Sequence, residues 1–140
     1  MSGDGTAPPI SYSIDRSLGI IFEVWRGDVT AADLGSYWKA YLANPEVLEL
    51  RRTLVDMREA TICFTGGEML ELVSNLVIPL LRGRDWKTAI VVQKPDQFGV
   101  SRQYHFFAEQ YSTDSIFFES DEALRWLQEQ GGVRLSPAPT

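Results

Sequence analysis

Segments with a strand pattern alternate with segments with a helix pattern along this 140-residue chain, and this alternation restricts its fold more than any other feature. Residues 10–14 alternate apolar and polar side chains, and residues 19–27 are rich in β-branched and aromatic side chains, as strands are. The turn between them contains Gly19, so the two segments predict an antiparallel hairpin. Further strands are predicted at 52–57, 87–94 and 115–120.

Helices are predicted before, between and after these later strands. The first follows Thr30, which caps it with Asp33 three residues on, and ends at Asn44-Pro45. The next two span residues 68–81 and 98–111. The last is predicted to be capped by Ser120 and to end at Gly131.

Strands separated by helices need crossover connections, so the last three strands should be mutually parallel. The uninterrupted apolar run at 89–92 supports this, because strands buried on both faces are typical of parallel sheets. The sequence therefore predicts one α/β domain, residues 10–131, with a five-stranded mixed sheet and four main helices. Residues 1–9 and 132–140 are expected to be a flexible N-terminal arm and a flexible C-terminal tail.

Charge and composition argue against several kinds of partner. A net charge of −6 and a pI near 4.7 do not suit nucleic acid, which needs clustered Lys and Arg. The longest apolar run, residues 70–81, is too short and too interrupted for a membrane span. The first nine residues lack a signal-peptide pattern and Cys63 is the only cysteine, so we expect a cytoplasmic protein. We expect Cys63 to be a small buried hydrophobe.

Little in the sequence indicates an enzyme. His105 is the only histidine, which excludes a multi-histidine metal site, and we expect it to be solvated beside Arg102 and Glu109. Nucleophile elbow, P-loop and dinucleotide-binding glycine motifs are all missing. We therefore expect no catalytic activity, no metal and no cofactor. One alternative is a small hydrolase, which requires Asp56 and Glu59 to converge with His105 in one cleft.

Residues 65–68, Thr-Gly-Gly-Glu, satisfy the capping-box pattern at the start of the second long helix. Thr65 would accept a hydrogen bond from the N3 amide, while Glu68 reaches back to the cap amide. Capping alone explains both residues and is the favoured interpretation. A phosphate on Thr65 would also meet free N–H groups at the positive end of a helix dipole, so Thr65 is alternatively a regulatory acceptor.

Residues 19–34, residues 51–67 and the long helix after them resemble the STAS domain family. Its founding members are anti-sigma-factor antagonists, and their fold is called SpoIIAA-like. The element order is similar over residues 10–130, and the chain looks closest to a divergent bacterial branch labelled STAS/SEC14-like. The resemblance implies a non-enzymatic regulatory module that binds a protein partner in a bacterial cytoplasm.

In the family, a strand ends in an aspartate and a short loop leads to an Asp-Ser-Ser-Gly-like motif whose first serine is phosphorylated by a partner kinase. The resemblance places Asp56 on the strand-end aspartate, although a structural role in capping the following turn is favoured for it. Phe64 and Thr65 depart from the family's aspartate and serine. The binding surface implied is the loop at 59–67 with the start of the next helix. Its residues are Asp56, Glu59, Phe64, Thr65, Gly66, Gly67 and Glu68.

The helix predicted at 68–81 has apolar side chains around most of its circumference, more than one buried stripe requires. Burial under the helix at 98–111 is the leading interpretation. A homodimer partner, another protein or a lipid-like ligand are alternatives, and the interface residues would be Met69, Leu70, Val73 and Val77. The SEC14-like resemblance implies a second function, binding of an apolar small molecule or lipid. Its pocket walls would come from Trp25, Trp38, Tyr104, Phe106 and Phe107.

Overall fold

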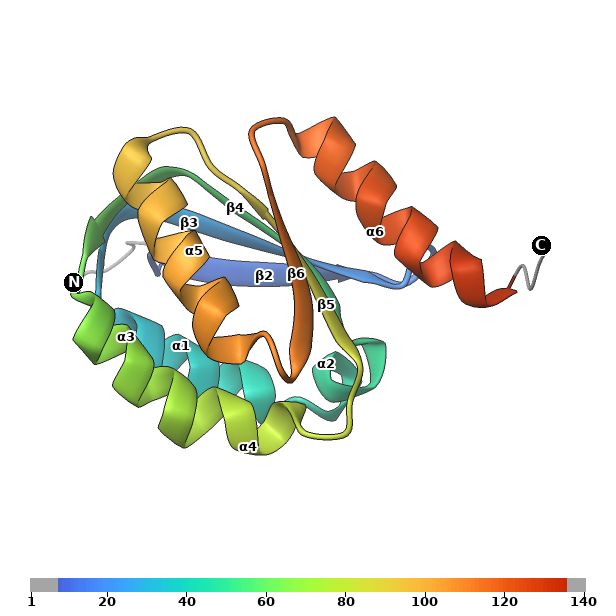
Figure 1. The fold of residues 1–140 in the computed structure, drawn as a ribbon, viewed down its shortest axis with the longest axis horizontal. Helices are drawn as coiled ribbons and strands as arrows, with labels where there is room; N and C mark the ends of the chain where they lie inside the picture. The colour runs from blue at the N-terminus through green and yellow to red at the C-terminus, as the bar shows by residue number, and fades with distance from the viewer. Residues whose placement is uncertain (1–7, 136–140) are drawn as a thin grey trace.

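The computed structural model describes residues 8–135, which form three layers (Figure 1). A five-stranded sheet is covered on one face by α1, α3, α4 and α5, and on the other by α6 alone. We call these the inner and the outer face. Residues 1–7 and 136–140, which make up most of the predicted arm and tail, lie outside the described range.

The strands are β2 (Ile10–Asp15), β3 (Ile20–Thr30), β4 (Arg52–Cys63), β5 (Trp86–Val91) and β6 (Ser112–Phe117). The helices are α1 (Ala31–Leu42), α2 (Pro45–Leu50), α3 (Gly66–Leu72), the π-helix η1 (Val73–Val77), α4 (Ile78–Leu81), α5 (Pro95–Ala108) and α6 (Ser120–Leu135).

The sheet is mixed, as predicted, with the strand order β2-β3-β4-β5-β6. The hairpin pairs β2 and β3 antiparallel, with Ile14 opposite Ile21. Every later pair is parallel, and Thr53, Thr88 and Asp114 lie side by side on β4, β5 and β6. The alternation of strands and helices predicted this arrangement, because each helix returns the chain to the same end of the sheet.

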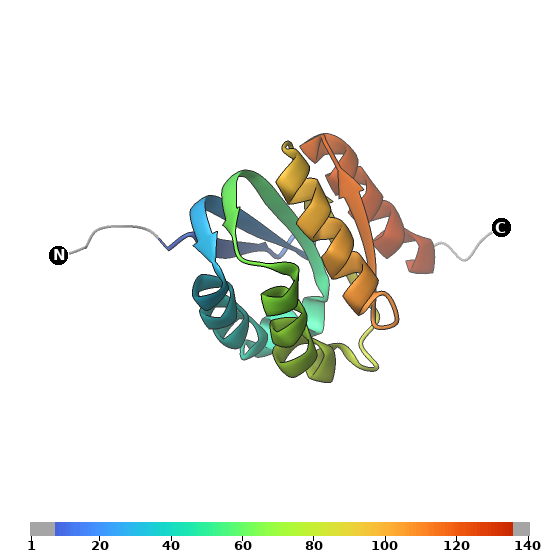
Figure 2. The same cartoon turned by 60° about the vertical axis from the view of Figure 1, so that its left-hand side comes forward.

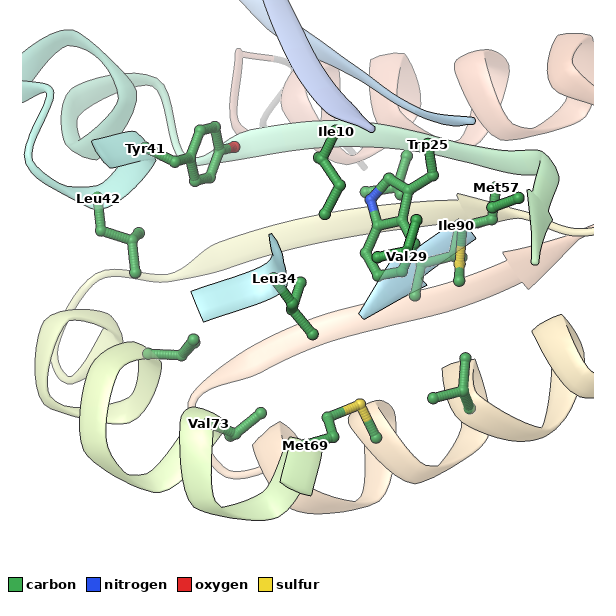
Figure 3. Close-up of a cluster of buried hydrophobic side chains, with 14 of the residues drawn as sticks. Ile10, Trp25, Val29, Leu34, Tyr41, Leu42, Met57, Met69, Val73 and Ile90 are labelled. Carbon is green, nitrogen blue, oxygen red and sulfur yellow. The ribbon is translucent and has the colours of Figure 1, made fainter. Parts of the chain in front are cut away.

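The inner face holds the larger of the two hydrophobic cores (Figure 3). Strand residues such as Trp25 and Met57 meet Leu34 of α1 and Met69 of α3 there. The capping box predicted at Thr30 is present: the Thr30 hydroxyl oxygen accepts from the Asp33 amide at 3.2 Å, and Asp33 accepts from the Thr30 amide at 3.0 Å. This cap fixes where α1 leaves β3 and turns its apolar face toward the sheet.

The second long helix is not a continuous α-helix. Its middle turn is the π-helix η1, in which the Ile78 amide donates to the Val73 carbonyl five residues back. Pro79 follows directly, and a proline has no N–H and its ring displaces the carbonyl four residues before it. The wider π turn accommodates that displacement and keeps Val73 and Val77 buried.

Several element boundaries differ from the prediction. Strand β4 continues to Cys63, so most of the predicted loop at 59–67 is strand paired with β3. Strand β6 begins at Ser112, three residues before its prediction. Helix α2 was not predicted; Asn44 caps it and Pro45 occupies its first turn.

Helices α5 and α6 also differ from the prediction. Helix α5 begins at Pro95 because Gln97 caps it, accepting from the Gln93 and Lys94 amides at 2.8 and 3.0 Å. Ser120 is the first residue of α6 rather than its cap. The prediction that Gly131 ends this helix is wrong, since α6 runs on to Leu135.

Helix α6 closes the outer face through a small core of its own. Ala123 and Leu127, four residues apart and so on one side of the helix, are fully buried against Leu54, Ala89 and Val91. Figure 2, turned by 60° from Figure 1, also shows α6 separated from the other helices by the sheet.

We expect Leu127→Ala to lower the free energy of unfolding by about 2–5 kcal/mol, because Leu127 is fully buried and its truncation leaves a cavity in the outer core. Urea denaturation monitored by circular dichroism measures this. Arg125→Ala, an exposed position on the same helix, is the control and should change stability by less than about 0.5 kcal/mol. A Leu127→Ala loss no larger than that of the control would show that α6 does not hold the outer face.

Candidate functional site

A cavity of about 70 Å³ lies between the inner face of the sheet and α1, α3, η1, α4 and α5. Its walls are mostly apolar, and the core residues Leu34, Met57 and Met69 that Figure 3 labels are among them. Well-packed protein interiors have few voids larger than a water molecule, so this space is unusual for a core. Six aromatic side chains line it: Trp25, Trp38, Tyr41, Phe64, Trp86 and Tyr104.

The one carboxyl group that lines the cavity belongs to Glu23, on β3 between Ile21 and Trp25. Side chains two residues apart on a strand share a face, which places Glu23 on the inner face with both neighbours. Only 4% of Glu23 is exposed. The Trp25 indole Nε1–H donates to its Oε2 at 2.7 Å, and the Tyr37 hydroxyl donates to its Oε1 at 2.8 Å.

Burial raises the pKa of Glu23 to about 7, because removal from water disfavours the charged form. The hydrogen bonds from Trp25 and Tyr37 act in the opposite direction, since they stabilise the carboxylate, but they do not outweigh burial. Burial is also the main reason that the pKa of the Tyr104 hydroxyl is raised, with Asp114 and Glu23 as lesser causes. The cavity therefore contains a carboxyl group that exchanges its proton near neutral pH.

Hydroxyl groups form a second polar region of the cavity. Tyr41 and Thr53 share a hydrogen bond of 2.6 Å between their hydroxyl oxygens, and the Trp86 indole donates to the Thr53 hydroxyl at 3.4 Å. Thr88 lies beside Thr53 in the sheet and also lines the cavity. Ser101 of α5 donates to the Met57 sulfur at 3.4 Å, a weak acceptor.

Comparison with known proteins identifies the architecture. The structure superimposes on a crystal structure of an uncharacterized DUF3478-family protein from Shewanella loihica PV-4, described as having a SpoIIAA-like fold, with a TM-score of 0.58 and 21% sequence identity. The match covers 89% of this chain and 98% of that one. The fold is SpoIIAA-like. No family model matches the sequence, and no curated protein matches it either, so the likeness establishes the fold alone.

In this SpoIIAA-like fold, the predicted cap at Thr65 is present and exposed. The Thr65 hydroxyl oxygen accepts from the Glu68 amide at 3.1 Å, and Glu68 accepts from the Thr65 amide at 2.8 Å. Gly66 lies so close to α5 that an added Cβ would come within 2.7 Å of the Gln103 Nε2. Phe64, just before the cap, packs against Trp25 with ring centroids 6.2 Å apart and lines the cavity.

Asp56 and Glu59 lie in one group of charged side chains with Arg26 and Arg58. Asp56 accepts from the Arg58 guanidinium at 2.9 and 3.0 Å and from its amide at 3.1 Å. Desolvation alone would raise the pKa of Asp56, but these Arg58 hydrogen bonds outweigh it and lower that pKa. Glu59 is exposed and lies 3.7 Å from the Arg26 guanidinium. The Asp56 carboxylate is thus held by Arg58, and it lies within β4 and not at the strand's end.

His105 is remote from Asp56, because α5 covers the inner face whereas Asp56 shares the outer face with Leu54. Its Nδ1 lies 3.7 Å from Oδ2 of the buried Asp114. The His105 side chain is 46% exposed, as predicted, but its ionic neighbour is Asp114 rather than the Arg102 and Glu109 of the prediction. The arrangement required for a hydrolase built on Asp56, Glu59 and His105 is absent.

Met69, Val73 and Val77 are buried in the inner core, so of the four predicted interface residues only Leu70, at 43% exposed, is accessible to a protein partner. Met69 and Val77 line the cavity instead, where a ligand could contact them. The burial under α5 that was the leading interpretation explains their apolar character. Cys63 is exposed rather than buried, because β4 extends past the inner core to the edge of the domain. Among the described residues, no three metal-ligating side chains cluster, and no helix is long and apolar enough to cross a membrane.

We predict that Glu23→Gln changes the pH dependence of stability. A carboxyl whose pKa is raised on folding favours the folded state below its ordinary pKa, and this contribution is lost as pH rises through the folded value of about 7. Relative to wild type, Glu23→Gln should therefore gain about 2–3 kcal/mol of stability between pH 5 and pH 8. Urea denaturation at several pH values measures this difference.

Asp114→Asn is the matched control for this experiment. Asp114 is also a buried carboxyl, and burial raises its pKa to about 6, but it does not line the cavity. The stability difference between Asp114→Asn and wild type should therefore appear over a lower pH range than the difference between Glu23→Gln and wild type. Parallel stability curves for wild type and Glu23→Gln over this range would contradict the account of Glu23.

Proposed function

We propose that this protein binds a small, largely apolar molecule in the cavity between the inner face and α1, α3 and α5. The observation that carries the proposal is the ring of six aromatic side chains around unfilled space that also contains Glu23. Ligand sites are typically apolar clefts with a few placed polar groups that fix the orientation of the ligand. The carboxyl of Glu23 and the hydroxyls of Thr53, Thr88 and Ser101 supply such groups.

The size of the cavity narrows the class of ligand. One water needs about 10–15 Å³ of such space, so about 70 Å³ holds only a few waters and lies below the roughly 300–1,000 Å³ of typical ligand pockets, which restricts the ligand to a small organic molecule. A long acyl chain would require the helices to move apart. The small-molecule part of the predicted second function is therefore supported better than the lipid part.

The proposed function is binding without catalysis. Both oxygens of Glu23 already accept hydrogen bonds from Trp25 and Tyr37, which hold the carboxyl in one orientation. The lining residues include no histidine, cysteine or lysine that could act with it as a nucleophile or second proton carrier. This arrangement suits recognition of a polar group on a ligand.

Native mass spectrometry of protein purified from its own cells tests this function. We expect wild type to carry a bound small molecule and Val100→Phe to carry none, because Val100 lines the cavity and a phenyl ring would fill it. Arg102→Ala, on the exposed side of the same helix, is the control and should retain the molecule. Circular dichroism checks that each variant is folded.

The function is contradicted if the wild-type protein carries no small molecule and none from a diverse library raises its thermal unfolding temperature. Retention of the same molecule by a folded Val100→Phe variant would place binding elsewhere on the protein.

A second candidate is the predicted protein-interaction module switched at Thr65. The observation in its favour is that Thr65, Glu68 and Leu70 are all exposed at the start of α3. A phosphate on Thr65 would add negative charge beside the free amides of this helix start and would alter what can dock there. The same loop carries Phe64 of the cavity wall, so a partner bound here would lie close to the ligand site.

Thr65→Glu tests the second candidate in pull-downs from native cells. We expect it to lose at least one protein that wild type captures, because the new charge occupies the proposed contact surface. Thr65→Ala separates this effect from loss of the cap, which costs about 1 kcal/mol of stability. Thr61→Glu, at a nearby exposed position of β4, is the charge control. A Thr65→Glu variant that binds every captured partner as tightly as wild type would count against the switch.

A further inference from the structure

We infer that the molecule bound in the cavity is a small organic cation of the alkylammonium class, with its charged end between Glu23 and the surrounding aromatic rings. This inference rests on the proposed function and adds the charge and chemical class of the ligand. Three independent features support it: the charge of the lining, the rings and the hydrogen bonding of Glu23.

The first feature is the charge of the cavity wall. Glu23 carries its only carboxyl group, and no lysine, arginine or histidine lines the space. A buried carboxylate without a cationic partner is costly, because both water and a counter-charge are missing. A second anion placed beside the ionised carboxylate would add repulsion at low dielectric, which disfavours carboxylate and phosphate ligands. A cation would instead supply the missing counter-charge.

The second feature is the arrangement of the rings. They come from the strands β3 and β5, the helices α1 and α5, and the loop before α3, so they surround the space from several directions. Trp38 and Tyr104 approach with centroids 6.1 Å apart, and Tyr41 and Trp86 with centroids 6.5 Å apart. The negative face of an aromatic ring attracts cations, tryptophan most strongly, and such rings recognise substituted ammonium groups. Three of the chain's four tryptophans line this cavity.

The third feature is the hydrogen bonding of Glu23. A carboxylate can accept about four hydrogen bonds, and Trp25 and Tyr37 use one on each oxygen. The two donors hold the group in place, and each oxygen can accept one more donor from a ligand. An ammonium group provides N–H donors and charge together, and a quaternary ammonium provides charge with methyl groups that pack against the rings.

A matched pair of probes tests the inference: choline and 3,3-dimethylbutan-1-ol. The two have the same shape, but the alcohol has a neutral carbon where choline has its charged nitrogen. Propylammonium and propan-1-ol form a smaller pair. The indole N–H signals of the four tryptophans, followed by nuclear magnetic resonance, report binding. Trp25, Trp38 and Trp86 line the cavity, whereas Trp126 packs in the outer core and is an internal reference.

We expect at least one cation to shift the three cavity signals saturably, with a dissociation constant at least tenfold lower than that of its neutral partner. Glu23→Gln should weaken binding of the cation at least tenfold and leave binding of the alcohol unchanged, because the substitution removes the charge and keeps the shape of the side chain. Asp114→Asn, a buried carboxyl that does not line the cavity, should preserve the preference.

The other outcomes overturn the inference and separate it from the proposed function. Neutral probes that bind as tightly as the cations would refute the ligand class, but the proposal that the cavity binds a small molecule would stand. Equal cation binding by Glu23→Gln would do the same. If no probe shifts the cavity signals, or Trp126 shifts with them, the ligand class is refuted, and native mass spectrometry decides whether the pocket binds anything.

Discussion

The hydrogen bonds from Trp25 and Tyr37 to the buried carboxyl of Glu23 are the interaction on which the functional account depends. A carboxyl group in an apolar core is destabilising unless its oxygens are satisfied, and each of these has one donor. Even so, burial raises the pKa of Glu23 to about 7, so the group is held at a cost in stability above that pH. Well-packed apolar side chains in its place would avoid that cost, so the fold does not require a carboxyl here, in line with the recognition role proposed for it.

The cavity follows from the asymmetry of the SpoIIAA-like fold. Helix α6 alone covers the outer face and packs tightly through Ala123 and Leu127, whereas several helices share the inner face. Large rings from both the helices and the strands meet over the inner face in tilted pairs, such as Trp38–Tyr104 and Tyr41–Trp86, and the cavity lies among them. The exposed loop at Thr65 closes one side of this space through Phe64, so the candidate interaction surface and the candidate ligand site are neighbours.

The parts of the structure that local patterns control were predictable, and those that tertiary contacts control were not. Strand and helix alternation predicted the mixed sheet, and four-residue patterns predicted the capping boxes at Thr30 and Thr65. The continuation of β4 to Cys63 was missed, because those residues pair with β3 and their pattern alone does not show it. Glu23 was missed because a charged residue in a hairpin strand is typical of a solvent-facing position. Its one sequence signal is the apolar run at 20–22 directly before it, which indicates a strand buried on both faces.

Titration of the Glu23 side-chain carboxyl carbon by nuclear magnetic resonance tests the central claim most directly. The account predicts a midpoint close to pH 7 in the protein without ligand, and a lower midpoint once a bound cation stabilises the carboxylate. A midpoint near the ordinary glutamate value of about 4.3 would show that water reaches the group. Glu23 could not then be the buried recognition group described for the cavity.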